Sequence, residues 1–254
     1  MKIAVCLKPV PATDTRVKID AAGKRLDPAG VSMVINPYDE FALEEALKLK
    51  EAAGSGEVVL VTVGPPSFAA TIRNGLAMGA DSAVLLGAEG ELDSLQVARA
   101  LAAELKDKGY DLILCGKQAV DDDASQVAPM IAELLGLPCA TVVAQLTIEG
   151  AVAPGATAHA HREIEGGIEE VSFTLPAVVA AQKGLNEPRY PSLKGIMAAK
   201  KKTVEERPAQ AGEPALEVIG LTLPPARSSG RIVGEGVGAV EELVRVLREE
   251  AKVI

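Results

Sequence analysis

The first half of the chain alternates short apolar runs with longer amphipathic segments. Four runs, at residues 3–7, 58–63, 83–86 and 112–115, are apolar at nearly every position rather than at every second one. Such runs are typical of strands in a parallel sheet whose two faces are both covered. Because helical patterns separate them, their order predicts an α/β fold with a doubly wound parallel sheet and right-handed crossovers.

Helix signals lie between these runs. The first begins with Asn36, a favoured N-cap residue, and Pro37, which suits the first helical position. Within it, Glu44 and Lys48 stand one turn apart, which predicts a favourable ion pair. The remaining helices are marked by a cap at Ser67 and a stop at Gly79, a start at Asp93 or Ser94, and the helical spacing of Val127, Met130, Ile131 and Leu134.

The second half has a different pattern. Two alternating segments, 162–165 and 168–171, flank a Gly-Gly pair at 166–167 and predict a β-hairpin extension. Residues 175–181 form another apolar run. Residues 186–192 hold two prolines within four positions, which excludes a regular helix or a central strand there.

The C-terminal part of the chain is predicted to form an arm outside the core. Residues 206–238 are rich in Pro, Gly, Ala and Ser and have few periodic apolar positions, so we expect them outside the core. An amphipathic helix follows near 237–250, with an apolar face formed by Val240, Leu243, Val244 and Leu247. We therefore expect a domain at 1–204 and an arm with a helix at 205–254, which wraps around its own core or a partner.

Composition narrows the function classes. The net charge of −9 and the 2% aromatic content argue against nucleic-acid binding, which needs many cationic side chains and stacking platforms. No apolar stretch approaches the roughly 20 residues of a membrane span, and the N-terminal apolar run is too short for a signal peptide. Cys6, Cys115 and Cys139 lie far apart without a C-x-x-C motif, which favours a reducing compartment, the cytoplasm.

We predict no metal site. His159 and His161 face the same side of a strand, but the sequence offers no carboxylate or thiolate cluster beside them, so an exposed strand pair is the favoured interpretation. Asp121 and Asp123 leave a lone Mg²⁺ site as a weaker alternative, because the spacing of an EF-hand is absent. The dinucleotide fingerprint, the P-loop and the nucleophile elbow are also missing.

The strand ends are the expected place for a ligand, because doubly wound sheets bind ligands beyond the carboxyl ends of their strands. Residues 6–8, 63–64 and 116–118 end there, and the loop 121–126 leads into a helix with Pro129 in its first turn or at a kink. The N-terminus of this helix could seat a phosphate on its N–H groups. The alternative is that three polar residues only cap the helix, namely Asp122, Asp123 and Ser125.

A basic loop at 183–202, which contains two prolines, is a second candidate site. Its cationic residues are Lys183, Arg189, Lys194, Lys200, Lys201 and Lys202. The functional interpretation is a docking loop, in which Leu193 is an apolar anchor and the lysines steer an acidic partner. The alternative is a solvated surface loop, which is the usual state of a charged run.

Several segments resemble the β subunit of electron transfer flavoproteins. The most specific is 185–202, LNEPRYPSLKGIMAAKKK, which is similar to that family's signature. The others occur in the family's order and spacing: NPYDE at 36–40 with the helix that follows, the TIR to AMGAD stretch at 71–81, GKQAVDDD at 116–123, and REIEGG at 162–167 followed by LPAV at 175–178. Together the matches run from residue 2 to about residue 204.

The resemblance implies a fold of the adenine-nucleotide-binding type and a heterodimer with an α subunit. It also implies one FAD, held mostly by the α subunit, and a structural AMP buried in the β subunit. The implied role is that of an electron carrier rather than an enzyme. The complex takes electrons from acyl-CoA and related dehydrogenases, as in fatty acid β-oxidation, and passes them to a membrane quinone oxidoreductase.

Residue by residue, the resemblance puts the cofactor at the strand ends and helix start described above, with Tyr38 nearest the flavin. The expected cofactor-binding residues are Cys6, Asn36, Pro37, Tyr38, Asp39, Val63, Gly116, Asp121, Asp122, Asp123, Ala124, Ser125, Gln126, Val127, Ala128, Pro129, Met130, Ile131 and Ala132. A recognition loop at 183–202 is implied, with Leu193 as its anchor. Its docking residues are Arg189, Tyr190, Leu193, Ile196, Lys200, Lys201 and Lys202.

Departures from the family pattern keep alternatives open. Residues 125–128 read SQVA where the common pattern is NQTG, and the Gln-Val pair resembles the bifurcating branch, whose β subunit binds a second FAD and meets NADH. That branch usually has Gly where Asp122 stands, so we favour AMP. A stand-alone nucleotide-binding stress protein and an ATP pyrophosphatase are further alternatives. Their glycine-containing phosphate loops are missing at 116–119 and 8–11 respectively.

Overall fold

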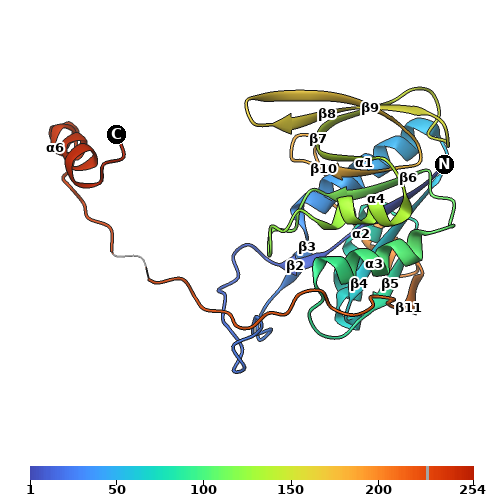
Figure 1. Ribbon diagram of the computed structural model, residues 1–254, viewed down its shortest axis with the longest axis horizontal. Coiled ribbons are helices and arrows are strands. Elements are labelled where there is room, and N and C mark those ends of the chain that lie inside the picture. The colour runs from blue at the N-terminus through green and yellow to red at the C-terminus, as the bar shows by residue number, and fades with distance from the viewer. Residues whose placement is uncertain (227–228) are drawn as a thin grey trace. The chain divides into compact units, whose positions relative to one another are not determined.

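The computed structural model describes residues 1–226 and 229–254. In the compact unit Met1–Gly220, a nine-stranded sheet has the order β11-β5-β4-β1-β6-β10-β7-β8-β9 (Figure 1). Its strands are β1 (Lys2–Cys6), β4 (Glu57–Gly64), β5 (Ser82–Gly87), β6 (Leu112–Gly116), β7 (Cys139–Ile148), β8 (Thr157–Ile164), β9 (Gly167–Thr174), β10 (Ala177–Ala181) and β11 (Val204–Pro208). From β11 to β7 all neighbours are parallel, whereas β7, β8 and β9 pair antiparallel. The predicted doubly wound parallel sheet is therefore confirmed.

Helices cover both faces of this sheet. One face carries α1 (Pro37–Ala53), α2 (Ala69–Met78) and α5 (Leu193–Ala199), and the other carries α3 (Ser94–Leu105) and α4 (Val127–Leu135). Successive residues of β1 enter different cores: Val5 packs with the first group of helices and Ala4 with the second. This alternation explains why the buried strands are apolar at every position.

The site of ligand binding follows from the strand order. Strand β1 has β4 on one side and β6 on the other, and the chain forms β4 and β5 before it crosses to β6. The carboxyl ends of β1 and its two neighbours therefore surround the switch point of the sheet, where such folds open a crevice. A short antiparallel ribbon of β2 (Pro9–Pro11) and β3 (Met33–Ile35) follows β1.

Three local signals for helix starts and turns have different outcomes. The side chain of Asp93 accepts from the backbone N–H of Gln96 at 2.8 Å, so this residue caps α3 as predicted. Ser67 does not cap α2, because it lies inside a short 3₁₀ helix, η1 (Pro66–Phe68), that precedes it. The hairpin turn is at 165–166 rather than at 166–167, since the strand register pairs Ile164 with the second glycine.

The segment after residue 204 differs from the expected arm. Strand β11 pairs with β5 and completes the edge of the sheet. Beyond it, the Gln96 side chain donates to the carbonyl of Gly212 at 3.0 Å, and Asp93 accepts from the backbone N–H of Ala215 at 2.6 Å. The compact unit thus extends to Gly220, past the boundary expected after 204.

The second unit, Leu221–Ile254, contains the predicted C-terminal helix. It consists of a 3₁₀ turn, η2 (Val237–Ala239), then α6 (Val240–Arg245), then a π-helical turn, η3 (Val246–Glu250). Its apolar side chains Val240, Leu243 and Val244 are partly exposed. None of the helices within the described residues has the length and apolar character needed to cross a membrane.

Candidate functional site

One pocket lies at the carboxyl ends of β1, β4 and β6. Its floor is apolar and is formed by Cys6, Val61, Val63, Leu101 and Cys115. Its rim is polar and contains Lys8, Asn36, Asp39, Gln118, Asp122 and Ser125. An apolar floor with a few convergent polar groups is the usual character of a small-ligand site.

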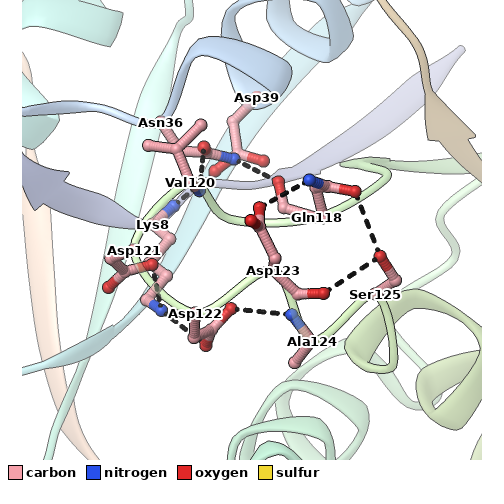
Figure 2. A network of polar contacts seen from close by, with 10 residues as sticks. All are labelled: Lys8, Asn36, Asp39, Gln118, Val120, Asp121, Asp122, Asp123, Ala124 and Ser125. Atoms are coloured by element: carbon pink, nitrogen blue, oxygen red, sulfur yellow. Dashed lines mark hydrogen bonds and ion pairs between the residues drawn. The ribbon is translucent and has the colours of Figure 1, made fainter. Parts of the chain in front are cut away.

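Two side chains from the start of α1 hold the strand ends around this pocket. The Asn36 side chain donates to the carbonyl of Gln118 at 2.8 Å and accepts from the backbone N–H of Val120 at 3.2 Å (Figure 2). Asp39 accepts from the backbone N–H of Lys8 at 2.7 Å and of Gly116 at 2.9 Å. Asn36 is the N-cap of α1, as predicted, but its side chain makes no capping bond, because its amide joins α1 to the loop after β6.

Asp39 is buried at the junction of these elements. Burial raises the pKa of this carboxyl to about 7, and the N–H donors of Lys8 and Gly116 only partly oppose it. A Cβ at position 116 would come within 2.4 Å of the Asp39 carboxylate, so this position requires Gly. Close packing of β6 against the start of α1 thus shapes the back of the pocket.

The loop at 121–126, which we call the aspartate loop, contributes to the polar rim of the pocket. Lys8 Nζ lies 2.8 Å from a carboxylate oxygen of Asp121 and 3.0 Å from one of Asp122. Burial disfavours the charged form of Lys8, but these two carboxylates outweigh it and raise the pKa of the amine. The Gln118 amide donates to Asp123, and the Ser125 hydroxyl donates to Gln118 at 3.2 Å (Figure 2).

The next feature is the junction between the loop at 121–126 and α4. Asp123 and Ser125 have positive φ values of 49° and 55°, and the carboxylate of Asp122 accepts from the backbone N–H of Ala124 at 3.1 Å. The N-cap of α4 is Gln126, and its side chain makes no capping bond. The alternative in which Asp122, Asp123 and Ser125 merely cap this helix is therefore wrong.

The start of α4 faces the pocket and presents backbone N–H groups to it. Gln126, Val127 and Ala128 line the pocket, and Pro129 lies in the first turn of the helix, as predicted. The first N–H groups of a helix have no intrahelical acceptor and carry partial positive charge. An anion such as a phosphate can bind there without a cationic side chain.

The structure gathers only part of the predicted cofactor set around this pocket. Among the predicted residues, those that line it are Cys6, Asn36, Asp39, Val63, Gly116, Asp122, Ser125, Gln126, Val127 and Ala128. Those outside its lining are Pro37, Tyr38, Asp121, Asp123, Ala124, Pro129, Met130, Ile131 and Ala132. Ile131 and Ala132 belong to α4 and are buried in the core. The ammonium of Lys117 lies 5.1 Å from the centroid of the Tyr38 ring.

Some lining residues were not predicted. They are Lys8, Phe68, Leu92, Ser94, Val97 and Lys117, together with Leu7, Val61, Leu101, Cys115, Gln118 and Ala119. Gln118 and the residues at 6–8 were expected at strand ends, so position alone could have included them. Phe68, Leu92 and Ser94 come from η1 and the entry to α3, and only the tertiary fold brings them here.

The predicted docking loop is more ordered than expected, because residues 193–199 form helix α5 capped by Ser192. Tyr190 and Leu193 are 95% and 83% exposed, and Ile196 is also exposed. Lys200 and Lys201 are exposed as well. The apolar anchor expected at position 193 is thus accessible.

Two of the predicted docking residues, Arg189 and Lys202, have contacts within the chain. The guanidinium of Arg189 binds Glu44 at 2.8 Å and also Glu51, so Glu44 does not form the ion pair predicted with Lys48. That lysine instead lies 3.5 Å from Glu45. The ammonium of Lys202 donates to the backbone carbonyls of Leu76, at 3.1 Å, and Ala80. These contacts pin the loop to α1 and α2.

The two histidines belong to the surface of the hairpin extension. His159 lies 2.8 Å from the Ser172 hydroxyl and 3.0 Å from the Glu149 carboxylate, and His161 lies 3.5 Å from Glu170. Within residues 1–226 and 229–254, the structure contains no group of three or more His, Cys, Asp or Glu side chains placed to hold a metal ion.

The sequence of the chain is similar to those of known proteins over most or all of its length. The sequence model of the electron transfer flavoprotein domain matches residues 25–211. The chain is 44% identical to the electron transfer flavoprotein subunit beta of Bacillus subtilis (strain 168), over 95% of this chain and 96% of that protein. It is 42% identical to the subunit of that name from Bradyrhizobium diazoefficiens, over the full length of both. It is 38% identical to the mitochondrial one from Arabidopsis thaliana, again over the full length of both. The chain therefore belongs to the family of electron transfer flavoprotein β subunits.

Proposed function

We propose that this chain binds AMP in the pocket at the strand ends and pairs with an α subunit to hold one FAD. The complex then carries electrons from acyl-CoA and related dehydrogenases to a membrane quinone oxidoreductase. The observation that carries the nucleotide assignment is the pocket itself, with its apolar floor and the uncapped start of α4. The family membership carries the role in electron transfer.

The residues present fit an adenosine monophosphate. The apolar floor, which includes Val61, Val63 and Leu101, suits the face of an adenine ring. The N–H groups at the start of α4 suit a phosphate, whereas the charge of Lys8 is already paired with Asp121 and Asp122. FAD would supply the redox chemistry of the complex, and AMP would stabilise the fold around its pocket.

A bifurcating subunit with a second FAD and NADH remains the second candidate, because Gln126 and Val127 resemble that branch. The contacts of Asp122 favour AMP. Its carboxylate lines the pocket and is ion-paired with Lys8, so side chains occupy this part of the pocket wall. A glycine at this position would leave that wall open.

Gln126→Glu tests the nucleotide assignment. A carboxylate at the N-cap favours helix α4 through the helix dipole, but it repels a bound phosphate at the same place. The heterodimer, co-expressed with its α subunit, should keep its FAD and lose AMP by about tenfold or more. Gln145→Glu, the same change at an exposed position of β7, is the matched control. An unchanged AMP content in Gln126→Glu would contradict the assignment.

A further inference from the structure

Cys6 and Cys115 stand side by side in the sheet. Strands β1 and β6 are parallel neighbours, and their register pairs Ala4 with Ile113 and Val5 with Leu114. One step further along both strands brings Cys6 opposite Cys115. Neighbouring strands lie about 4.8 Å apart, and opposed residues point to the same face of a sheet. That spacing falls within the range of about 4.4–6.8 Å between the Cα atoms of a disulfide.

The two thiols face one another on the α4 side of the sheet. Both cysteines are buried in the same hydrophobic cluster, and both have free thiols. A hydrogen bond with Cys6, followed by burial, raises the pKa of Cys115 well above its ordinary value. Both side chains also line the floor of the nucleotide pocket, so a small solute that enters the pocket reaches them.

We propose that Cys6 and Cys115 are a redox-sensitive pair, which a peroxide converts to a disulfide when the pocket is free of nucleotide and which a bound nucleotide protects. The protection rests on the proposed AMP function, whereas the pairing rests on the strand register alone. In the first step, one thiol attacks the peroxide, forms a sulfenic acid and releases one water. In the second, the other thiol attacks that sulfur, the S–S bond forms, and a second water leaves.

The consequence is a link between oxidation and nucleotide content. A disulfide draws the sulfur atoms together to about 2.05 Å and so reshapes the pocket floor. The raised pKa of Cys115 lowers its reactive thiolate fraction at neutral pH, so we expect this thiol to be oxidised slowly. We expect the oxidised complex to rebind AMP more weakly, by about tenfold or more, and to recover when a dithiol reduces it.

The test uses the heterodimer with Cys139→Ser, which removes the exposed thiol on β7. Samples that retain nucleotide, and samples from which it has been removed, are treated with hydrogen peroxide and digested without reduction. We expect a peptide pair joined through Cys6 and Cys115, about 2 Da lighter than the two free thiols, and reversed by dithiothreitol. It should form about tenfold faster in the nucleotide-free sample.

The outcomes separate the two proposals. Sulfinic acids on single cysteines without the joined pair would overturn the redox pair, even if the released nucleotide proves to be AMP. Equal rates with and without nucleotide would overturn the protection. A joined pair in a complex that releases no AMP would leave the redox pair standing and contradict the proposed function. These readouts need no substitution in the core, so a variant that fails to fold cannot obscure them.

Discussion

At the scale of single residues, Asp39 links the stability of the fold to pH. Its folded pKa of about 7 lies above the ordinary value of 3.8, so between pH 4 and pH 7 the folded chain holds a proton that the unfolded chain has lost. The free energy of unfolding should therefore fall as pH rises through this window, by at most about 1.4 kcal/mol per pH unit, and the contribution is fully present only below pH 4.

Urea unfolding between pH 4.5 and 7.5 checks this dependence against Asp39→Asn. The amide cannot titrate, and it turns an N–H group toward the backbone N–H of either Lys8 or Gly116. At pH 5 the variant should be less stable by about 1–3 kcal/mol, and its pH slope should be shallower. Asp14→Asn, at an exposed position, is the control. Equal slopes in Asp39→Asn and the wild type would show that Asp39 is ionised throughout.

Arg189 offers a second test at this scale, because its expected docking role and its observed contacts predict different results. The Glu44 side chain is only 7% exposed, and Arg189→Ala would leave its carboxylate without this partner. Removing one member of a fully buried pair costs about 3–5 kcal/mol, and the partial exposure of the arginine reduces this to about 1–3 kcal/mol of unfolding free energy. Lys194→Ala, in the same loop, should change stability little. Unchanged stability in Arg189→Ala would leave the residue as a docking group only.

At the scale of elements, α5 carries the docking prediction. Leu193 is 83% exposed on a helix held in place by Arg189 and Lys202, so a partner could bury it without distorting the core. Leu193→Ala should weaken dehydrogenase docking by about ten- to a hundredfold, as expected for one lost aliphatic anchor. Flavin content and melting temperature should not change. The measurement is steady-state flavin reduction by a cognate dehydrogenase at varied carrier concentration.

Ile168→Ala, at an apolar position of β9 that is 65% exposed, is the control for α5. If both substitutions have the same effect, or if activity falls only with lost flavin, Leu193 is no anchor. Charge reversal at Lys200 and Lys201 should act on the association rate and fade at high salt. Lys202 is unsuited to this test because its ammonium binds carbonyls of α2 and the turn after it.

At the scale of elements, the sequence predicts those features of the fold that depend on residues close in the chain. Buried parallel strands and the helix start at Asp93 depend on neighbours in the chain, so their patterns were sufficient. The N-cap position of Asn36 was predicted, but its amide bonds to a loop more than 80 residues away, which no local pattern reveals. Strand β11 was missed because it is a short, charged edge strand, and its partner β5 lies far back in the chain. Part of the pocket lining has the same origin, since Phe68 and Ser94 reach it only through folding.

At the scale of the whole molecule, the unit Leu221–Ile254 is expected to embrace the α subunit. Its helix leaves Val240, Leu243 and Val244 partly exposed, and an apolar face of this kind gains stability when a partner covers it. A chain ending at Gly220 should fold with a near wild-type melting temperature and fail to retain the α subunit in co-purification. A chain ending at 203 should lose stability as well, because it lacks β11. Normal pairing by the chain that ends at Gly220 would contradict the embracing role.

On the proposed function, the pocket at the strand ends holds AMP while the heterodimer carries a single FAD. Denaturing the purified heterodimer and separating the released nucleotides by chromatography measures this directly. The predicted result is one AMP and one FAD per heterodimer. Two FAD molecules and no AMP would contradict the claim and assign the chain to the bifurcating branch.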